Sequence, residues 1–98
     1  MDFKVVITRS AIKDLEEITH LITKDDSQSA ELFGNLLIDR DLSLQKFPKI
    51  GRKVPEFNDA TIREISHTPY RIIYRLRPNT NQIHILHFWH AARGKPSF

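Results

Sequence analysis

The chain contains no cysteine. Disulfide bonds, thiolate nucleophiles and cysteine-ligated metal sites are therefore excluded, and the absence fits the reducing cytosol, where disulfides are rare. The opening segment, MDFKVVITRS, has no apolar stretch long enough for a signal peptide. No run approaches the roughly 20 apolar residues that span a bilayer. We expect a cytoplasmic protein with no membrane partner.

Motifs for phosphate, metal or covalent chemistry are also missing. With only three glycines, the sequence has no Gly-rich phosphate loop, and it shows neither a Ser-His-Asp set nor paired carboxylates near a histidine. We therefore expect no cofactor. What is present is an ordinary globular composition. The 98 residues, 40% hydrophobic and 28% charged, predict a single domain that spans residues 1–98.

Charge is distributed unevenly along the chain. Residues 1–46 carry six Lys/Arg and nine Asp/Glu, a balance of −3, whereas residues 47–98 carry nine Lys/Arg and three Asp/Glu, a balance of +6. The two halves sum to the formal net charge of +3. A basic segment attracts polyanions, so the second half predicts nucleic acid or an acidic protein as the partner. A lopsided solvated surface is the alternative.

Apolar periodicity predicts two helices after a short strand at residues 3–8. Thr8 or Ser10 can cap the first helix, residues 24–27 separate the two, and Pro48 ends the second. So short a join predicts an antiparallel helical hairpin. The two apolar stripes are Ala11, Ile12, Leu15, Ile18, Leu21 and Ile22, and then Ala30, Phe33, Leu36, Leu37, Leu44 and Phe47.

Three further strands are expected after a basic Pro/Gly loop at residues 47–55 and a turn at residues 57–60. They cover residues 61–66, 70–76 and 82–90, and the short gaps between them favour antiparallel pairing. The predicted order is β-α-α-β-β-β. The fold class is therefore α+β, a small antiparallel-dominated sheet packed by an N-terminal helical hairpin.

The segment YRIIYRLR, residues 70–77, carries arginines on one face of its strand. Alternation places Arg71, Arg75 and Arg77 on the face opposite Tyr74. A guanidinium is shaped for two-pronged contact with phosphate or carboxylate, so three arginines with no acid favour a binding surface. The alternative is an exposed strand face that simply carries charge.

Three histidines recur at three-residue spacing in the last strand. On a strand, His84 and His90 would face one way, roughly 20 Å apart, and His87 the other, so no shared metal site is expected. His87 should lie beside Ile85 and Trp89 as a hydrogen-bonded core histidine. His90, at the strand end, can reach an exposed site.

Four segments resemble the RelE/ParE superfamily of bacterial toxins in order and spacing: ITRSAIKDLEEI, LQKFPKIGRKVPEF, IREISHTPYRIIYRL and ILHFWHAARG. They cover nearly the whole chain, and the ParE-like, plasmid stabilization branch is the most similar. The combination of FP-x-x-GR-x-VPE with IRE and PYRIIYR is the specific part. The resemblance implies a small sheet with an N-terminal helical hairpin, a cognate antitoxin, and operator DNA bound only through the toxin–antitoxin complex.

The resemblance also implies one of two targets. ParE-like members inhibit DNA gyrase by binding, whereas RelE-like members cut mRNA on the ribosome. The glutamate, arginine and C-terminal histidine of some ribonuclease members correspond to Glu56, Arg71 and His90. Such a set can accept the 2′-OH proton, stabilise the charged phosphorane and protonate the leaving oxygen. A salt bridge to a nearby arginine is the simpler role for Glu56.

We favour gyrase as the target, because the loop lysines typical of RelE-like members are only partly present, as Lys49, Arg52 and Lys53. The ribonuclease is the first alternative, and an inactive homologue kept as a repressor partner is the second. Whether the protein inhibits gyrase or cuts mRNA, we expect the basic second half of the chain to make the contacts with the target. The residues expected to bind the target or RNA are Arg52, Lys53, Arg63, Arg75, Arg77, Trp89, Arg93 and Lys95.

Overall fold

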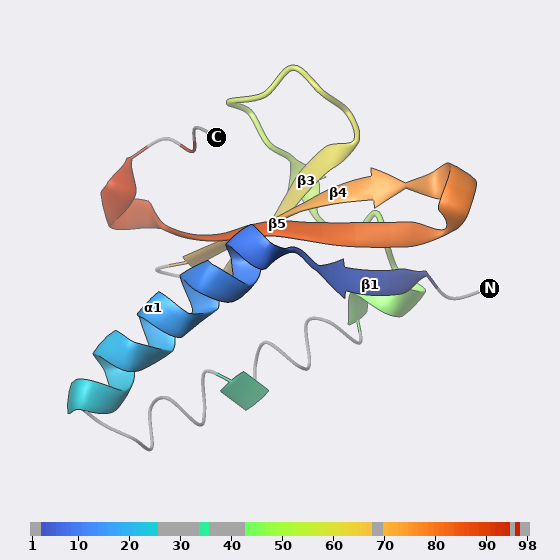
Figure 1. The fold of residues 1–98 in the computed structure, drawn as a ribbon. Helices are drawn as coiled ribbons and strands as arrows, with labels where there is room; N and C mark the ends of the chain where they lie inside the picture. The colour runs from blue at the N-terminus through green and yellow to red at the C-terminus, as the bar shows by residue number, and fades with distance from the viewer. Residues whose placement is uncertain (1–2, 26–33, 36–42, 68–69, 95, 97–98) are drawn as a thin grey trace.

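The computed structural model describes residues 3–25, 34–35, 43–67, 70–94 and 96. A twisted sheet forms the middle of the molecule, and one long helix lies across one of its faces (Figure 1). The elements are β1 (Lys4–Ile7), α1 (Arg9–Asp25), β2 (Arg52–Lys53), β3 (Ile62–His67), β4 (Tyr70–Arg77) and β5 (Gln82–His90), with 3₁₀ turns η1 (Pro78–Thr80) and η2 (Ala91–Arg93). No helix within these described ranges is long and apolar enough to cross a membrane.

The sheet has five strands in the order β1-β5-β4-β3-β2. β1 and β5 are parallel, and the other three pairs are antiparallel. The first and last strands of the chain are therefore neighbours. Two neighbouring parallel strands need a long crossover connection, and here the connection contains α1, β2, β3 and β4. The α+β class predicted from the sequence is confirmed.

The predicted strands agree with β3, β4 and β5 to within one residue. The loop predicted at residues 47–55 needs correction, because β2 lies within it and pairs with β3. α1 also continues to Asp25, two residues into the break predicted at residues 24–27. Of the predicted second helix, residues 34–35 and 43–46 are helical, and its other residues lie outside the described ranges. Phe47, predicted on its buried stripe, is 62% exposed.

Thr8 fixes the start of α1 against β5. Its hydroxyl accepts a hydrogen bond from the Ala11 amide at 3.2 Å and donates one to the Ile85 carbonyl at 2.7 Å. The cap predicted from the sequence is thus also a tertiary contact. Ala11 is fully buried and Leu15 packs on the core, but Ile12, predicted alongside them, is exposed.

A bulge in β5 changes which side chains face α1. Along β4, Ile73 lies opposite His87, while the next residue, Tyr74, lies opposite Ile85, so β5 has one extra residue between these pairs. Ile85 belongs to the core under α1, and Trp89 belongs to the cluster on the other face. The sequence prediction that placed Ile85 and Trp89 on one face is wrong, because a bulge reverses the alternation beyond it.

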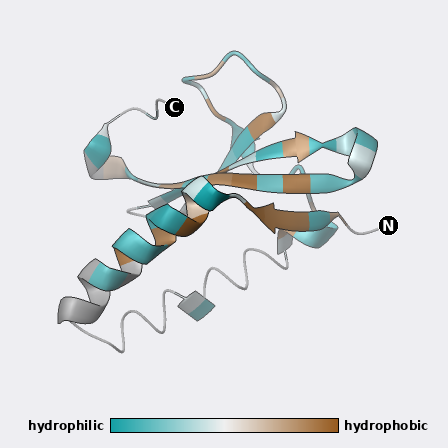
Figure 2. Ribbon diagram, viewed as in Figure 1, coloured by the Kyte–Doolittle hydropathy of each residue, from teal (hydrophilic) through white to brown (hydrophobic). Residues whose placement is uncertain are grey.

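Two hydrophobic clusters pack on opposite faces of the sheet. The larger one lies under α1, and the smaller one lies under the segment between β2 and β3, which rises from the other face (Figure 1). Along β5, hydrophobic stretches are separated by hydrophilic residues (Figure 2). The larger cluster is Ala11, Leu44, Ile72, Tyr74, Leu76, Ile83, Ile85 and Phe88, and the smaller is Val54, Ile62, Ile73 and Trp89.

The buried Tyr74 hydroxyl holds the basic loop before β2 on the sheet. It donates to the Pro48 carbonyl and accepts from the Gly51 amide, each at 2.9 Å, and burial raises the pKa of Tyr74. Arg63 donates to the Gly51 carbonyl at 2.9 Å. A Cβ at Gly51 would lie 2.5 Å from the Glu64 carbonyl oxygen and 2.6 Å from the Tyr74 hydroxyl. The loop can approach the sheet this closely only because residue 51 has no side chain.

Gly51→Ala is therefore expected to lower the free energy of unfolding by about 1–3 kcal/mol, because the loop or β3 must shift to admit the methyl group. The matched control is Gly34→Ala, since a Cβ at the helical Gly34 meets nothing within 4 Å. That variant should be neutral or gain up to about 1 kcal/mol. Urea unfolding followed by circular dichroism measures both, and equal stabilities would contradict the close approach at Gly51.

Candidate functional site

Arg71 lies at the centre of an ion-pair network on the face opposite α1. Its Nε donates to Glu64 at 2.7 Å, and its Nη1 and Nη2 donate to the two carboxylate oxygens of Glu56 at 3.1 and 2.8 Å. The Nη2 group also contacts Glu64. The side chain of Arg71 is only 15% exposed. Both edges of the guanidinium are therefore occupied by carboxylates from the same chain.

Glu64 is the residue of this network that the sequence prediction missed. Its carboxylate is fully buried and lies between two arginines, with Arg52 Nε at 2.7 Å from the oxygen that Arg71 does not contact. The signal was present in the pattern. Glu64 lies two residues after the buried Ile62, so it shares that inward face, and a buried acid needs a cation.

Because of this network, the charge on the arginine face of β4 differs from the sequence prediction. The hydrogen bonds from Arg71 hold the pKa of Glu56 below its usual value, and Glu56 in turn raises the pKa of Arg71. The prediction of three arginines without an acid is wrong for Arg71, because the acids come from β3 and from the segment before it. The salt bridge that was the simpler role for Glu56 is confirmed.

The remaining cations differ in their surroundings. Arg75 lies 3.9 Å from Asp59, and the Nε atoms of Arg63 and Arg75 are buried without a hydrogen-bond partner among the described residues. Arg77 is exposed at the end of β4, and Lys53 is exposed on the edge strand β2. Arg75, Arg77 and the η1 turn line a hollow of about 420 Å³.

His90 lies on the other face of the sheet from Glu56 and Arg71. It pairs with Tyr70 across β4 and β5, their rings meet edge to face at 5.1 Å, and both line a small pocket with Asp14 and Glu17 of α1. Arg71 is the residue after Tyr70, so its side chain leaves the strand on the opposite face. The set predicted from the sequence, Glu56, Arg71 and His90, is thus divided between two faces of the sheet. Glu56 and Arg71 form a salt bridge on one face, and His90 lies on the other.

Trp89 anchors the turn that follows β5. Its indole Nε1 donates to the Gly94 carbonyl at 3.0 Å, and the Arg93 guanidinium lies 4.0 Å from the centre of its ring. Gly94 has a φ of +81°, which favours glycine. Trp89 itself is 4% exposed, so it supports the turn instead of offering a free binding face. Lys95, also predicted to bind, lies outside the described residues.

The other two histidines of β5 contact different neighbours. His87 Nδ1 lies 2.8 Å from the Asp14 carboxylate of α1, and His84 Nε2 lies 3.1 Å from the side chain of Gln82. The predicted alignment of His84 with His90 on one face is wrong, since the bulge lies between them. Within the described ranges, no group of three His, Cys, Asp or Glu side chains could hold a metal ion.

Three solved structures with a similar fold come from bacterial toxin–antitoxin systems. A chain of the chromosomal ParDE system of P. aeruginosa has a TM-score of 0.70 and 20% identity, covering 90% of this chain and 95% of that one. The RelBE2 complex of Mycobacterium tuberculosis gives 0.66 and 18%, covering 92% and 99%. A mutant of E. coli RelE in the free state gives 0.64 and 16%, covering 96% and 88%. The fold is that of the RelE/ParE-like toxins.

The family model of the ParE toxin of the type II toxin–antitoxin system, parDE, matches residues 5–94. The chain therefore belongs to the ParE toxin family and is a toxin of the type II class. No curated protein sequence matches it significantly.

Arg71→Ala is expected to lower the free energy of unfolding by about 3–5 kcal/mol, because it leaves the buried Glu64 facing Arg52 alone and Glu56 unpaired. Arg77→Ala, an exposed arginine six residues along the same strand, is the control and should change stability by less than about 0.5 kcal/mol. Chemical denaturation of both variants is the measurement. An Arg71→Ala protein as stable as the wild type would contradict the structural role.

Glu56 should make stability depend on pH in acid. Its pKa is lowered in the folded chain, so its contribution is complete above the unfolded value of about 4.5 and is lost as the pH falls through the folded pKa. Glu56→Gln lacks this contribution. The difference in unfolding free energy between wild type and Glu56→Gln should therefore be largest near neutrality and shrink below pH 4.5. Parallel stability curves from pH 7 to pH 2.5 would rule out the Glu56–Arg71 linkage.

Proposed function

We propose that this toxin acts by binding DNA gyrase and not by cutting RNA. One observation carries the proposal: the arginine that a ribonuclease would use is held by two carboxylates, on the face of the sheet away from the histidine. The match of the ParE toxin family over residues 5–94 supports the same conclusion.

The chemistry of RNA cleavage explains why this geometry matters. A base, an acid and a cation must all reach one phosphodiester group, within hydrogen-bond distance of the reacting atoms. Here the Arg71 guanidinium already has its Nε and both terminal nitrogens bonded to Glu56 and Glu64. Releasing it would leave the fully buried Glu64 carboxylate with only Arg52. Arg71 is therefore better suited to holding the fold than to meeting a phosphate.

A binding toxin needs exposed contacts and no proton transfer. The chain offers cations at the rim of the sheet, on β2, at the end of β4 and on the turn after β5, namely Arg52, Lys53, Arg77 and Arg93. Such groups steer association with a negatively charged surface. We further propose that the chain acts as one domain in the cytoplasm, paired with a cognate antitoxin as in the ParDE and RelBE2 systems, and meets operator DNA only through that complex.

The test measures the effect of the toxin and of two variants on both candidate targets, DNA gyrase and mRNA on ribosomes. Purified toxin should inhibit supercoiling by gyrase and leave mRNA on ribosomes intact. His90→Gln, which keeps a side chain of similar size with one donor, should inhibit gyrase within about threefold of the wild type. Truncation after Gly94 should weaken inhibition while keeping the hydrogen bond from Trp89. Circular dichroism controls for folding.

A ribonuclease would give the reverse result. Codon-specific cleavage of mRNA on ribosomes by the wild type, lost by about 10²–10³ in a folded His90→Gln variant, would overturn the proposal. Cleavage by neither protein together with no effect on gyrase would leave the chain as a repressor partner without toxicity, which also overturns it.

A further inference from the structure

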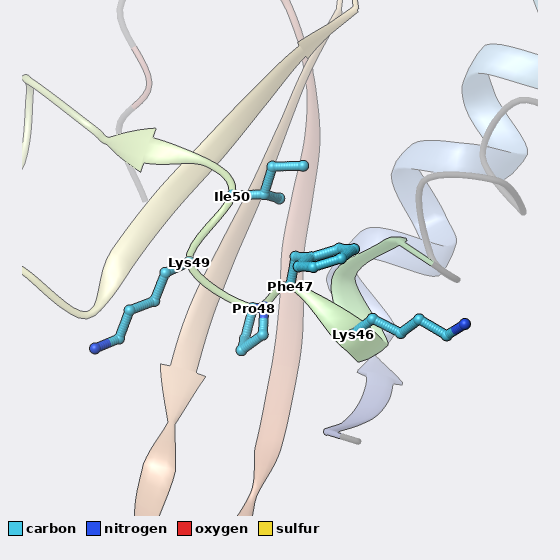
Figure 3. Close-up of a pocket in the computed structure, with 5 residues that line it drawn as sticks. All are labelled: Lys46, Phe47, Pro48, Lys49 and Ile50. Carbon is cyan, nitrogen blue, oxygen red and sulfur yellow. The ribbon is translucent and has the colours of Figure 1, made fainter. Parts of the chain in front are cut away.

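The loop before β2 carries the two most exposed large hydrophobic side chains among the described residues. Phe47 is 62% exposed and Ile50 is 54% exposed, and with Pro48 and the flanking lysines, Lys46 and Lys49, they line an open hollow of about 580 Å³. Figure 3 shows Phe47 and Ile50 on one side of the loop and the two lysines extending away in opposite directions. These five residues are called the loop patch below. Clustered apolar exposure of this kind marks a surface that a partner covers.

The loop patch is held in shape by the fold. The Phe47 amide donates to the Ser43 carbonyl at 2.8 Å, and the Ile50 amide donates to the Phe47 carbonyl at 3.1 Å. Tyr74 holds the same loop through the Pro48 carbonyl. Phe47 and Ile50 are therefore displayed on a fixed backbone and do not fold back onto the core. A preorganised surface loses little conformational entropy when a partner binds, which favours high affinity.

The charge of this loop indicates which kind of partner would fit it. From residue 42 to residue 55 the chain has four cations, Lys46, Lys49, Arg52 and Lys53, and no acid. β2, which carries the last two, is at the edge of the sheet and pairs with β3 on one side only. An extended segment with large apolar side chains and carboxylates could pair with this edge, insert into the hollow and neutralise the lysines.

We propose that the loop patch is the docking surface for an acidic, apolar segment of the cognate antitoxin. This rests on the antitoxin partnership proposed above. A permanent partner is favoured over the target because lasting complexes bury more apolar surface than transient ones do. An antitoxin that keeps the toxin neutral must cover Phe47 and Ile50 for the lifetime of the complex, whereas the rim cations that would meet gyrase lie outside the hollow.

The experiment measures binding of the purified product of the adjacent reading frame to full-length toxin by calorimetry. Phe47→Ser with Ile50→Ser should weaken binding at least 30-fold, as expected for buried apolar anchors. Lys46→Glu with Lys49→Glu should weaken it about 10-fold at low salt and less at high salt. The controls are Ile12→Ser, an exposed isoleucine on α1, and Arg77→Glu, an exposed cation on β4; both should bind within about threefold of the wild type.

A second readout separates this inference from the proposed function. Each variant is also expressed without the adjacent gene product, and the loop patch variants should stay toxic but escape neutralisation. Variants that bind the product normally and lose toxicity would place the target on the loop patch and overturn the inference. A larger loss with Ile12→Ser than with the loop patch variants would move the docking surface to α1. No binding by the wild type would refute the antitoxin pairing and the inference with it, while gyrase inhibition would stand.

Discussion

The buried carboxylate of Glu64 is the constraint on which the part of the sheet formed by β2, β3 and β4 depends. A fully buried acid is tolerated only with cations around it, and here Arg52 comes from β2 and Arg71 from β4. Glu56 then joins the second arginine, so the segment between β2 and β3 is tied down as well. One carboxylate thereby links three neighbouring strands, β2, β3 and β4, which also carry the buried Ile62 and Ile73 of the smaller hydrophobic cluster. The loop patch owes its position to the same arrangement, because it leads directly into β2.

Most residues of the motif that carries the family resemblance make contacts that hold the fold together. In FPKIGRKVPE, the proline carbonyl accepts from Tyr74, the glycine allows close approach to β3, and the arginine and the glutamate are members of the ion-pair network. Val54 is buried in the smaller cluster. These residues hold this fold together, and a fold does not by itself determine function, so the motif bears more directly on the fold than on the target.

Sequence patterns recovered what depends on near neighbours along the chain. The burial of Ala11, Leu15 and Ile18 along α1, the Thr8 cap and the limits of β4 and β5 follow from local preferences, and the structure confirms them. What the patterns missed depends on residues far apart in sequence. The parallel pairing of β1 with β5, the bulge between Ile85 and His87, and the burial of Glu64 all arise only when distant strands meet. The candidate catalytic set is divided between two faces for this reason, since its members were aligned by sequence position and the faces of β4 and β5 decide where their side chains point.

The distribution of charge supports the proposed binding function. Residues 47–98 contain three acids, Glu56, Asp59 and Glu64, and each lies beside an arginine on the face opposite α1. The acids therefore neutralise the middle of that face, and the positive excess of the second half is left at its edges: on the loop patch, on β2, at the end of β4 and at the turn after Trp89. A phosphoryl-transfer site concentrates positive charge at its centre, where charge develops in the transition state. A neutral centre with a basic, partly apolar rim is instead suited to holding protein partners, with the charge setting which partner is accepted and the apolar residues setting how long it stays.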